Sequence, residues 1–348
     1  MAQPRAATDM PLDRNESYWL LDDELLSACK EYGVRELSTY PDYGELRIEL
    51  ARYANVTPEQ ICLTPGSDAA IESIARELVG KDGEVVLPVP TFYGYESILD
   101  RASSTIRPIT YTEKDGQFHF PKEELLRKIE SESIKAVFLC NPNNPLGHAA
   151  SKEEVMEVID ALRPSTYLIS DEAYFEYSGF TLIDLLNRVP NLIIMRTLSK
   201  SFGIPGARIG YCIAAPEIIS HIEKLLLPWP IAHTSYFAAR QLLAREQYVK
   251  ERRDMVIQAR DAFVDALKEI EGIQVYPSVT NFVLMRTPKA EQVTSALSRK
   301  GIKVVLAEPM SRFPEAQKLL HSTIRMAIPS PQDMPIFLDT FRASLQDT

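Results

Sequence analysis

The chain has 348 residues, 45% of them hydrophobic and 25% charged, a composition that is typical of a globular enzyme and excludes a disordered or fibrous chain. Its 48 acidic and 38 basic residues give a net charge of −10 without a basic block, which argues against nucleic acid or an anionic membrane surface as a partner. No apolar run approaches the ~18 residues of a membrane helix, and residues 1–11 lack an apolar signal core, so we expect a cytoplasmic protein with a short mobile N-terminal tail.

Cysteines and histidines are scattered, without the spacing of a disulfide framework or a metal site. The four cysteines lie mostly in or beside apolar runs, which is typical of reduced core thiols in a cytosolic protein. The five histidines have no cysteine pair beside them, so the sequence predicts no metal site.

Three helices are predicted near the N-terminus from apolar spacing and glycine boundaries. They cover residues 16–32, which end at Gly33, then residues 43–54, and then residues 68–80.

Strand-like and helical patterns then alternate, which predicts a mostly parallel sheet covered by helices on both faces. Apolar runs predict strands over residues 84–89, 104–111, 135–140, 166–170, 191–196 and 208–214. Helical spacing predicts helices over residues 93–101, 121–131, 151–162 and 215–227.

The C-terminal part begins with one long charged helix predicted over residues 236–270. We therefore expect an α/β protein with a large domain of residues 34–250 and a smaller α/β domain of residues 1–33 together with 251–348. The smaller domain is predicted to contain strands over residues 273–276, 281–286, 302–306 and 322–328 and helices over residues 288–300 and 331–345.

The most informative segment runs from Arg196 to Arg208 and contains Lys200. Thr197 and Ser199 place hydroxyl groups beside the lysine. An amine that forms a Schiff base, next to hydroxyls and a guanidinium that bind phosphate, suits a phosphate-bearing aldehyde such as pyridoxal 5′-phosphate. For this segment alone, a surface lysine in a serine- and glycine-rich loop is an equal alternative.

A second candidate segment, Asp171-Glu172-Ala173-Tyr174, follows the apolar run at residues 167–170. A carboxylate at the end of a buried strand needs a cationic partner, and the protonated ring nitrogen of pyridoxal phosphate would supply one to Asp171. Tyr174 is then placed to reach the phenolic oxygen of the ring. The alternative is an aspartate that caps the following helix.

Two further segments fit the same cofactor. In the rigid loop Asn141-Pro142-Asn143-Asn144-Pro145, the amide of Asn144 can donate to the phenolic oxygen. Gly66, Ser67 and Asp68 open a helix, and the backbone amides at such a helix start bind a phosphate. An ordinary turn and an ordinary capped helix are the alternatives.

Together these segments resemble the class I and II aminotransferases of the fold type I pyridoxal-phosphate enzymes, and among them the histidinol-phosphate aminotransferases. The resemblance implies a large domain with a mostly parallel sheet between helices, a smaller α/β domain, and a homodimer with shared active sites. It also implies transfer of an amino group between an L-amino acid and a 2-oxo acid through imines of Lys200. Further matching segments are Leu12-Asp13-Arg14-Asn15-Glu16, Tyr40-Pro41-Asp42, Pro90-Thr91-Phe92, Ser278 with Asn281-Phe282, and Ile324-Arg325.

The resemblance implies roles for five more residues. Phe92 falls where the family stacks an aromatic ring on the cofactor, usually tyrosine or tryptophan. Tyr40 matches the tyrosine that reaches the cofactor phosphate of the neighbouring subunit. Arg325 matches the arginine that binds the substrate α-carboxylate, and Asn15 and Asn281 match positions near that carboxylate.

One departure concerns the substrate. Histidinol-phosphate enzymes carry a phosphate-binding arginine at about the position of Val305, and the valine predicts an unphosphorylated amino acid with an apolar or aromatic side chain. Lys303, which strand alternation would place on the same face as Val305, or Arg14 is an alternative source of positive charge. The aromatic residues expected near that side chain are Tyr18, Trp19, Phe92, Tyr93 and Trp229.

Other functions stay open at this stage. Leu146 stands where the family usually has threonine, and Met326 and Ala327 follow Arg325 in place of the usual valine and glycine. Decarboxylation, elimination or cyclisation on the same cofactor is therefore the main alternative. A non-catalytic cofactor-binding module is disfavoured, because the enzyme motifs account for nearly all of the sequence.

Overall fold

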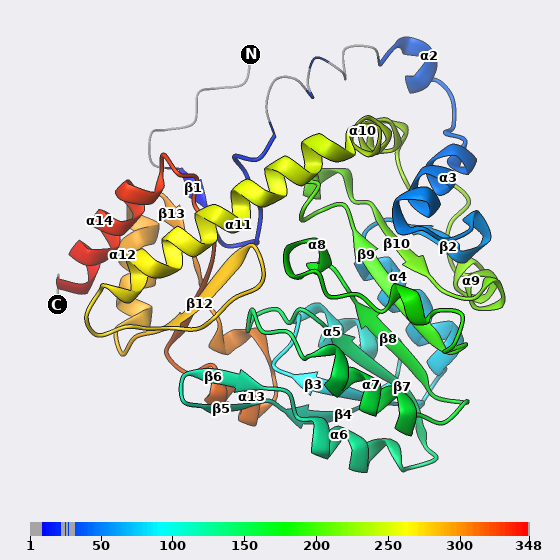
Figure 1. Cartoon of the computed structure of the whole chain (residues 1–348), viewed down its shortest axis with the longest axis horizontal. Coiled ribbons are helices and arrows are strands. Elements are labelled where there is room, and N and C mark those ends of the chain that lie inside the picture. The colour runs from blue at the N-terminus through cyan, green and yellow to red at the C-terminus, as the bar shows by residue number, and fades with distance from the viewer. Residues whose placement is uncertain (1–8, 22–24, 26, 28–31, 347–348) are drawn as a thin grey trace.

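The structure, a computed structural model, describes residues 9–21, 25, 27 and 32–346. A seven-stranded sheet forms the centre of the larger part, and a four-stranded sheet forms the centre of the smaller part. Figure 1 shows the helix α11 (Glu246–Lys268) running from the larger part to the smaller one. Among the described residues, no helix has both the length and the hydropathy for crossing a membrane.

The large sheet has the strand order β2-β10-β9-β8-β7-β3-β4. All neighbours from β9 to β4 pair in parallel, whereas β10 is antiparallel to both β9 and β2, so the prediction of a mostly parallel sheet is confirmed. The strands are β2 (Ile61–Thr64), β3 (Glu84–Val89), β4 (Thr105–Thr110), β7 (Ile134–Cys140), β8 (Tyr167–Asp171), β9 (Leu192–Thr197) and β10 (Gly210–Ile213).

Helices cover both faces of this sheet because its central strands are apolar on both sides. Alternate residues of one strand join two different side-chain clusters, as Val86 and Val85 of β3 do. One cluster includes residues of α3 (Tyr43–Ala54), α6 (Lys122–Ile129), α7 (Lys152–Ala161) and α10 (His233–Leu243). The other includes residues of α4 (Ser67–Ile74), its π-helical continuation Ala75–Val79, α5 (Gly94–Arg101) and α9 (Pro216–Glu223).

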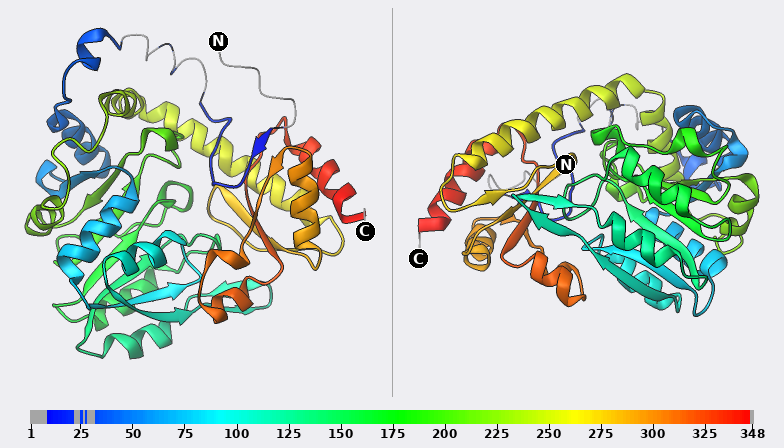
Figure 2. Two further views of the ribbon diagram at one scale, coloured as in Figure 1. Left: turned by 180° about the vertical axis from the view of Figure 1, so that it is seen from behind. Right: turned by 60° about the horizontal axis from the view of Figure 1, so that its bottom comes forward.

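The smaller part is built on the antiparallel sheet β11-β12-β15-β14. Its strands are β11 (Gln274–Val275), β12 (Phe282–Arg286), β15 (Thr323–Ala327) and β14 (Val305–Leu306). Apolar residues of α11, α12 (Ala290–Arg299) and α14 (Met334–Gln346) pack together in its core. Figure 2 shows this part set to one side of the large sheet. The domain boundaries at residues 34 and 250 stay a prediction.

The helix predicted over residues 16–32 is wrong for residues 16–21, which are not helical, whereas Leu25 and Ser27 are helical as predicted. The rest of residues 22–31 lies outside the described residues, and Gly33 caps the start of the short helix α2 (Val34–Leu37). Part of the expected tail is a strand, β1 (Met10–Pro11), which pairs with β13 (Ile302–Lys303). Pairing with a strand far along the chain fixes this segment, and local periodicity carries no information about it.

Two other predicted elements are each divided in the structure. The helix expected over residues 236–270 is α10 and α11, with a break at residues 244–245. The two packing environments differ, because α10 packs on the large sheet whereas Ala259, Phe263 and Leu267 of α11 belong to the smaller core. The strand expected over residues 302–306 is β13 and β14, which pair with different strands. Elements that the sequence did not predict are β2, β5 (Thr112–Lys114), β6 (Gln117–His119), α8 (Phe175–Ser178) and α13 (Pro314–Leu319).

Candidate active site

A cavity of about 320 Å³ lies where β7, β8 and β9 end. Ligands of open α/β sheets bind at the carboxyl ends of the strands, and the last residue of each of these three strands lines the cavity. Residues 13–16 and the smaller part also contribute to its wall. The predicted site residues among its lining are Asn15, Ser67, Asp68, Phe92, Asn144, Asp171, Tyr174, Thr197, Ser199, Lys200, Arg208 and Arg325. A larger cavity of about 880 Å³, beside the β5–β6 hairpin and α13, contains none of them.

Lys200 lies three residues beyond the end of β9, and its side chain is half-buried. Its Nζ donates to the backbone carbonyls of Arg14 and Asn15, both at 3.3 Å. The pKa of Lys200 is lowered to about 8, mainly by burial and to a smaller extent by the positive charge of Arg325. The neutral amine, which is the form that attacks a carbonyl carbon or accepts a proton, is therefore more populated near neutral pH than in an exposed lysine.

Asp171 is the last residue of β8 and is 4% exposed. Its Oδ2 accepts a hydrogen bond of 2.7 Å from the hydroxyl of Tyr95, and its Oδ1 accepts one of 3.1 Å from the backbone N–H of Ala173. Burial raises the pKa of Asp171 to about 6, and these two hydrogen bonds oppose that rise. The carboxylate is thus mostly ionised at neutral pH and has no cationic partner among the hydrogen bonds and ion pairs of the described chain.

Tyr174 and Asn144 each have their acceptor atom occupied. The amide of Asn15 donates to the Tyr174 hydroxyl at 3.0 Å, and Arg325 Nη1 donates to Asn144 Oδ1 at 2.8 Å. Each side chain keeps a hydrogen to donate into the cavity, which suits an anionic phenolic oxygen. Burial raises the pKa of Tyr174 above its usual value, so its hydroxyl stays protonated.

Arg325 reaches the cavity from β15 and is 5% exposed. Its Nη2 donates to the Asp13 carbonyl at 2.5 Å, while its buried Nε has no partner in the described part of the chain. Asn281 lies next to the cavity wall and donates to the Asn15 carbonyl at 3.0 Å. A buried guanidinium with a free N–H indicates that an anion is expected there.

Groups that can bind a phosphate line the cavity together with the first residues of α4. Arg208 Nη2 lies 3.4 Å from the Asp68 carboxylate, and the hydroxyls of Thr197 and Ser199 lie 3.0 Å apart. Gly66 precedes α4 with φ of 80°, and a side chain there would come within 2.6 Å of Arg208 Nη2. The left-handed backbone conformation therefore favours glycine, whereas the mobile end of the arginine could move away from a side chain.

Tyr40 does not line the cavity of its own chain. Its ring is 73% exposed and stacks on Trp229, with 4.3 Å between ring centroids. Trp229, Tyr18 and Trp19 are likewise absent from the lining, so their expected place near the substrate side chain stays a prediction. Tyr18 and Trp19 instead pack against the core of the smaller part. Phe92 and Tyr93 do line the cavity, as expected.

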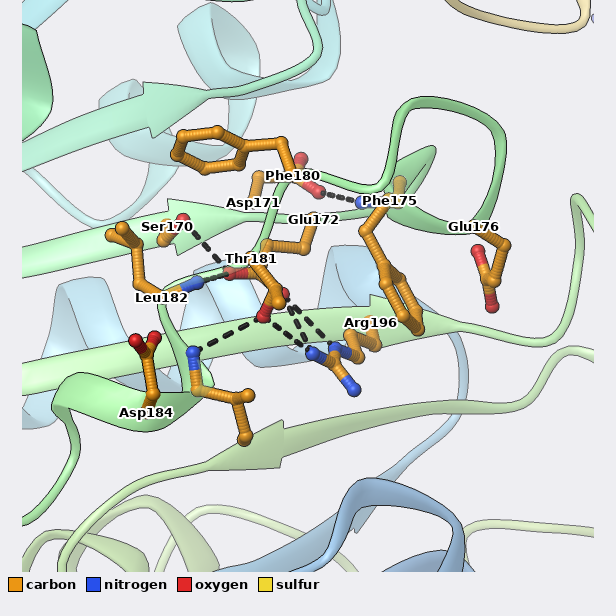
Figure 3. A network of polar contacts seen from close by, with 12 residues as sticks. Ser170, Asp171, Glu172, Phe175, Glu176, Phe180, Thr181, Leu182, Asp184 and Arg196 are labelled. Carbon is orange, nitrogen blue, oxygen red and sulfur yellow. Dashed lines mark hydrogen bonds and ion pairs between the residues drawn. The ribbon is translucent and has the colours of Figure 1, made fainter. Parts of the chain in front are cut away.

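Behind Asp171 lies a buried ion pair that the sequence did not predict, between Glu172 and Arg196 (Figure 3). Arg196 Nη2 and Glu172 Oε2 are 2.9 Å apart, and both side chains are nearly inaccessible. Thr181 and the backbone N–H of Leu182 also donate to Glu172, each at 2.8 Å. Because Glu172 follows Asp171 directly, this network fixes the chain at the end of β8.

Replacing Arg196 with methionine leaves the Glu172 carboxylate buried without its cation. We expect the free energy of unfolding to fall by about 3–5 kcal/mol, which is the usual cost of breaking a buried pair by removing one partner. Urea unfolding of the Arg196→Met variant measures this loss. The control is Arg240→Met, because Arg240 bridges Glu45 and Glu49 near the surface and should cost at most about 1 kcal/mol. Equal losses in the two variants would contradict the account.

Comparisons with known proteins bear on this cavity. A family model described as aminotransferase class I and II matches residues 9–341. A histidinol-phosphate aminotransferase of Thermoanaerobacter pseudethanolicus is 34% identical over 296 residues, which cover 84% of this chain and 83% of that protein. The crystal structure of the histidinol-phosphate aminotransferase of Sinorhizobium meliloti in complex with pyridoxal-5′-phosphate has a TM-score of 0.86 and 25% identity, covering 97% of this chain and 91% of that one. The L-threonine-O-3-phosphate decarboxylase of Porphyromonas gingivalis shares the fold, with a TM-score of 0.82 and 23% identity over 97% of this chain and 100% of that one.

Proposed function

The chain belongs to the class I and II aminotransferases, enzymes that use pyridoxal phosphate, and from that premise we propose that the cavity around Lys200 is its site of amino transfer. One observation carries the proposal. A lysine of lowered pKa, a buried carboxylate and a buried arginine converge on one cavity at the ends of three parallel strands. The reaction moves an amino group from an L-amino acid to a 2-oxo acid.

The residues present fit the cofactor. Bound pyridoxal phosphate supplies an aldehyde that carries the amino group and a ring that accepts the electron pair of the Cα–H bond. Arg208, the hydroxyls of Thr197 and Ser199, and the start of α4 would hold its phosphate. Phe92 would stack on its ring, and Tyr174 and Asn144 would donate to its phenolic oxygen.

Three residues act on the substrate and the ring. Lys200 would hold the cofactor through its amine, and the same amine, when free, would accept the proton from the substrate Cα as the general base. Asp171 supplies the negative charge that keeps the ring nitrogen protonated. Arg325 binds the carboxylate and orients the substrate so that the Cα–H bond, rather than the bond to the carboxylate, is the one that breaks.

We propose that the enzyme is a homodimer in which Tyr40 reaches the phosphate of the neighbouring subunit's cofactor. The supporting observation is that large apolar side chains on the segments carrying Tyr40 and its stacking partner Trp229 are exposed. They are Val34, Leu37, Tyr40, Leu227 and Trp229, each more than half exposed. A cytoplasmic location and the absence of a nucleic-acid partner, inferred from composition and charge, belong to the same proposal.

Replacing Tyr40 with phenylalanine removes only a hydroxyl, and we expect the affinity for pyridoxal phosphate to fall about tenfold, the usual effect of one hydrogen bond to a charged group. Cofactor titration of the apo-protein measures this change. Tyr167→Phe, at the opposite end of β8, is the control and should bind the cofactor normally. An active monomer in light scattering, or unchanged affinity in Tyr40→Phe, would contradict the shared site.

The anion subsite supports a substrate with a single negative charge. Val305 of β14 and Leu284 of β12 are the cross-strand partners of Arg325, so all three side chains project from the same face of the small sheet. On this face of the small sheet, Arg325 is thus flanked by two apolar residues rather than by a second cation. Lys303 pairs with Pro11 in a different strand pair and is exposed. Arg14 lines the cavity, but its side chain is 76% exposed, so water screens its charge more than that of Arg325.

We therefore propose an unphosphorylated amino acid with an apolar or aromatic side chain as the substrate, although curated relatives are named for histidinol phosphate. We expect kcat/KM for phenylalanine, tyrosine or leucine to equal or exceed that for histidinol phosphate. Recovery of the 2-oxo acid without carbon dioxide would separate amino transfer from decarboxylation. A preference for the phosphate ester beyond about a hundredfold, roughly 2.7 kcal/mol of transition-state binding, would overturn the substrate proposal.

A further inference from the structure

Tyr95 is fully buried beneath the cavity, at the start of α5, and does not belong to the cavity lining. Its hydroxyl donates to Asp171 Oδ2 at 2.7 Å, and this is the side-chain hydrogen bond that Asp171 accepts in the described structure. Asp171 and Phe92 belong to the predicted site, whereas Tyr95 lies in an apolar helix and no local pattern indicates that it contacts either of them.

Aromatic packing fixes the position of this hydroxyl. The Tyr95 ring makes T-shaped contacts with the rings of Phe92 and Phe138, at centroid distances of 6.0 Å and 5.5 Å. Gly94 makes room for this arrangement, because a side chain there would come within 2.4 Å of the Phe92 ring. The residue that would stack on the cofactor and the residue that bonds Asp171 are therefore held in one rigid unit.

The hydroxyl is also a permanent donor. Burial, together with the negative charge of Asp171, raises the pKa of Tyr95 well above its usual value, so the group does not lose its proton in the physiological range. A donated hydrogen bond stabilises the ionised form of a carboxylate over its protonated form. This hydrogen bond stabilises the ionised form of Asp171 against burial and the negative charges of Asp68 and Glu172, which all favour its protonated form.

We propose that Tyr95 is a positioning residue that holds Asp171 ionised and directs it toward the ring nitrogen of the cofactor. This inference rests on the proposed function, because it assigns Tyr95 a role only through Asp171. Without the hydroxyl, Asp171 would rotate more freely and would be protonated more easily, and a neutral carboxyl group does not retain a pyridinium ion. Tyr95 touches neither substrate nor cofactor in this role.

Cofactor binding tests the inference independently of turnover. The probes are pyridoxal phosphate and 1-deazapyridoxal phosphate, in which a CH group replaces the ring nitrogen and removes the partner of Asp171. The measured quantity is the ratio of their affinities for the apo-protein, followed by protein fluorescence. We expect the wild-type protein to prefer pyridoxal phosphate and Tyr95→Phe to reduce that preference about tenfold or more. In the Asp171→Asn background, Tyr95→Phe should change the ratio no further.

Tyr276→Phe is the matched control, because Tyr276 is equally buried but packs on Phe118 away from Asp171, and its ratio should equal that of the wild type. If Tyr95→Phe does not fold, Tyr95→His supplies a ring that can donate and should keep most of the preference. A wild-type ratio near one would overturn the role of Asp171 and with it the proposed function. If the wild type clearly prefers pyridoxal phosphate, two results would overturn the role of Tyr95 alone. One is that Tyr95→Phe retains the preference, and the other is that a folded Tyr95→His loses it entirely.

Discussion

Replacing Lys200 with alanine is expected to lower kcat by at least about 10⁴-fold. In the proposed mechanism the variant lacks both the amine that would hold the cofactor and the base that would remove the Cα proton, and base catalysis alone contributes about 10²–10⁴. Steady-state kinetics with saturating pyridoxal phosphate measures the loss. An added primary amine of small size should restore part of the rate, since the space of the missing side chain lies open to the cavity.

The control for this variant is Lys303→Ala, which removes an exposed lysine from β13. It should retain wild-type kinetics. Substantial activity in Lys200→Ala without added amine would contradict the assignment of Lys200, whereas a loss in Lys303→Ala would show that the substrate pocket includes a cation we have placed outside it.

Replacing Asp171 with asparagine should lower kcat by about 10²–10³, a typical cost of removing one electrostatic contact to the transition state. Asparagine keeps the shape of the side chain but removes the charge that holds the ring nitrogen protonated. The affinity for the cofactor should fall much less, because the residues that would bind its phosphate are unchanged. Asp184→Asn, which alters an exposed carboxylate paired with Lys152, is the control. Turnover near the wild-type level in Asp171→Asn would refute the role.

Six of the seven strands of the large sheet and the place of its proposed site could be predicted from the sequence, whereas β2 could not. Apolar runs alternate with helical patterns there, and the polar residues Asn144, Asp171 and Lys200 each follow a strand, so the fold rule for parallel sheets brings them together. The family, the fold type, the cofactor and amino transfer were also predicted from these motifs, and the comparisons confirm them. The roles of individual residues stay proposals.

What could not be predicted depends on contacts between distant parts of the chain. Residues 16–21 have helical spacing, yet the neighbouring Asn15 contacts Tyr174 and Asn281, and these contacts hold the segment against the cavity. In the sequence, Tyr95 resembles any residue of an apolar helix and Arg196 any residue of a strand. Their neighbours in the sequence do not indicate that each contacts a carboxylate at the end of β8. Periodicity predicts which side of an element is buried, but it does not identify the partner.

The most direct test of the site is the covalent attachment of the cofactor. The protein is incubated with pyridoxal phosphate, reduced with borohydride, digested and mapped by mass spectrometry. Our account predicts a single stoichiometric label on Lys200, lost in the Lys200→Ala variant. A label on another lysine, with Lys200 unmodified, would contradict the assignment of this cavity as the active site.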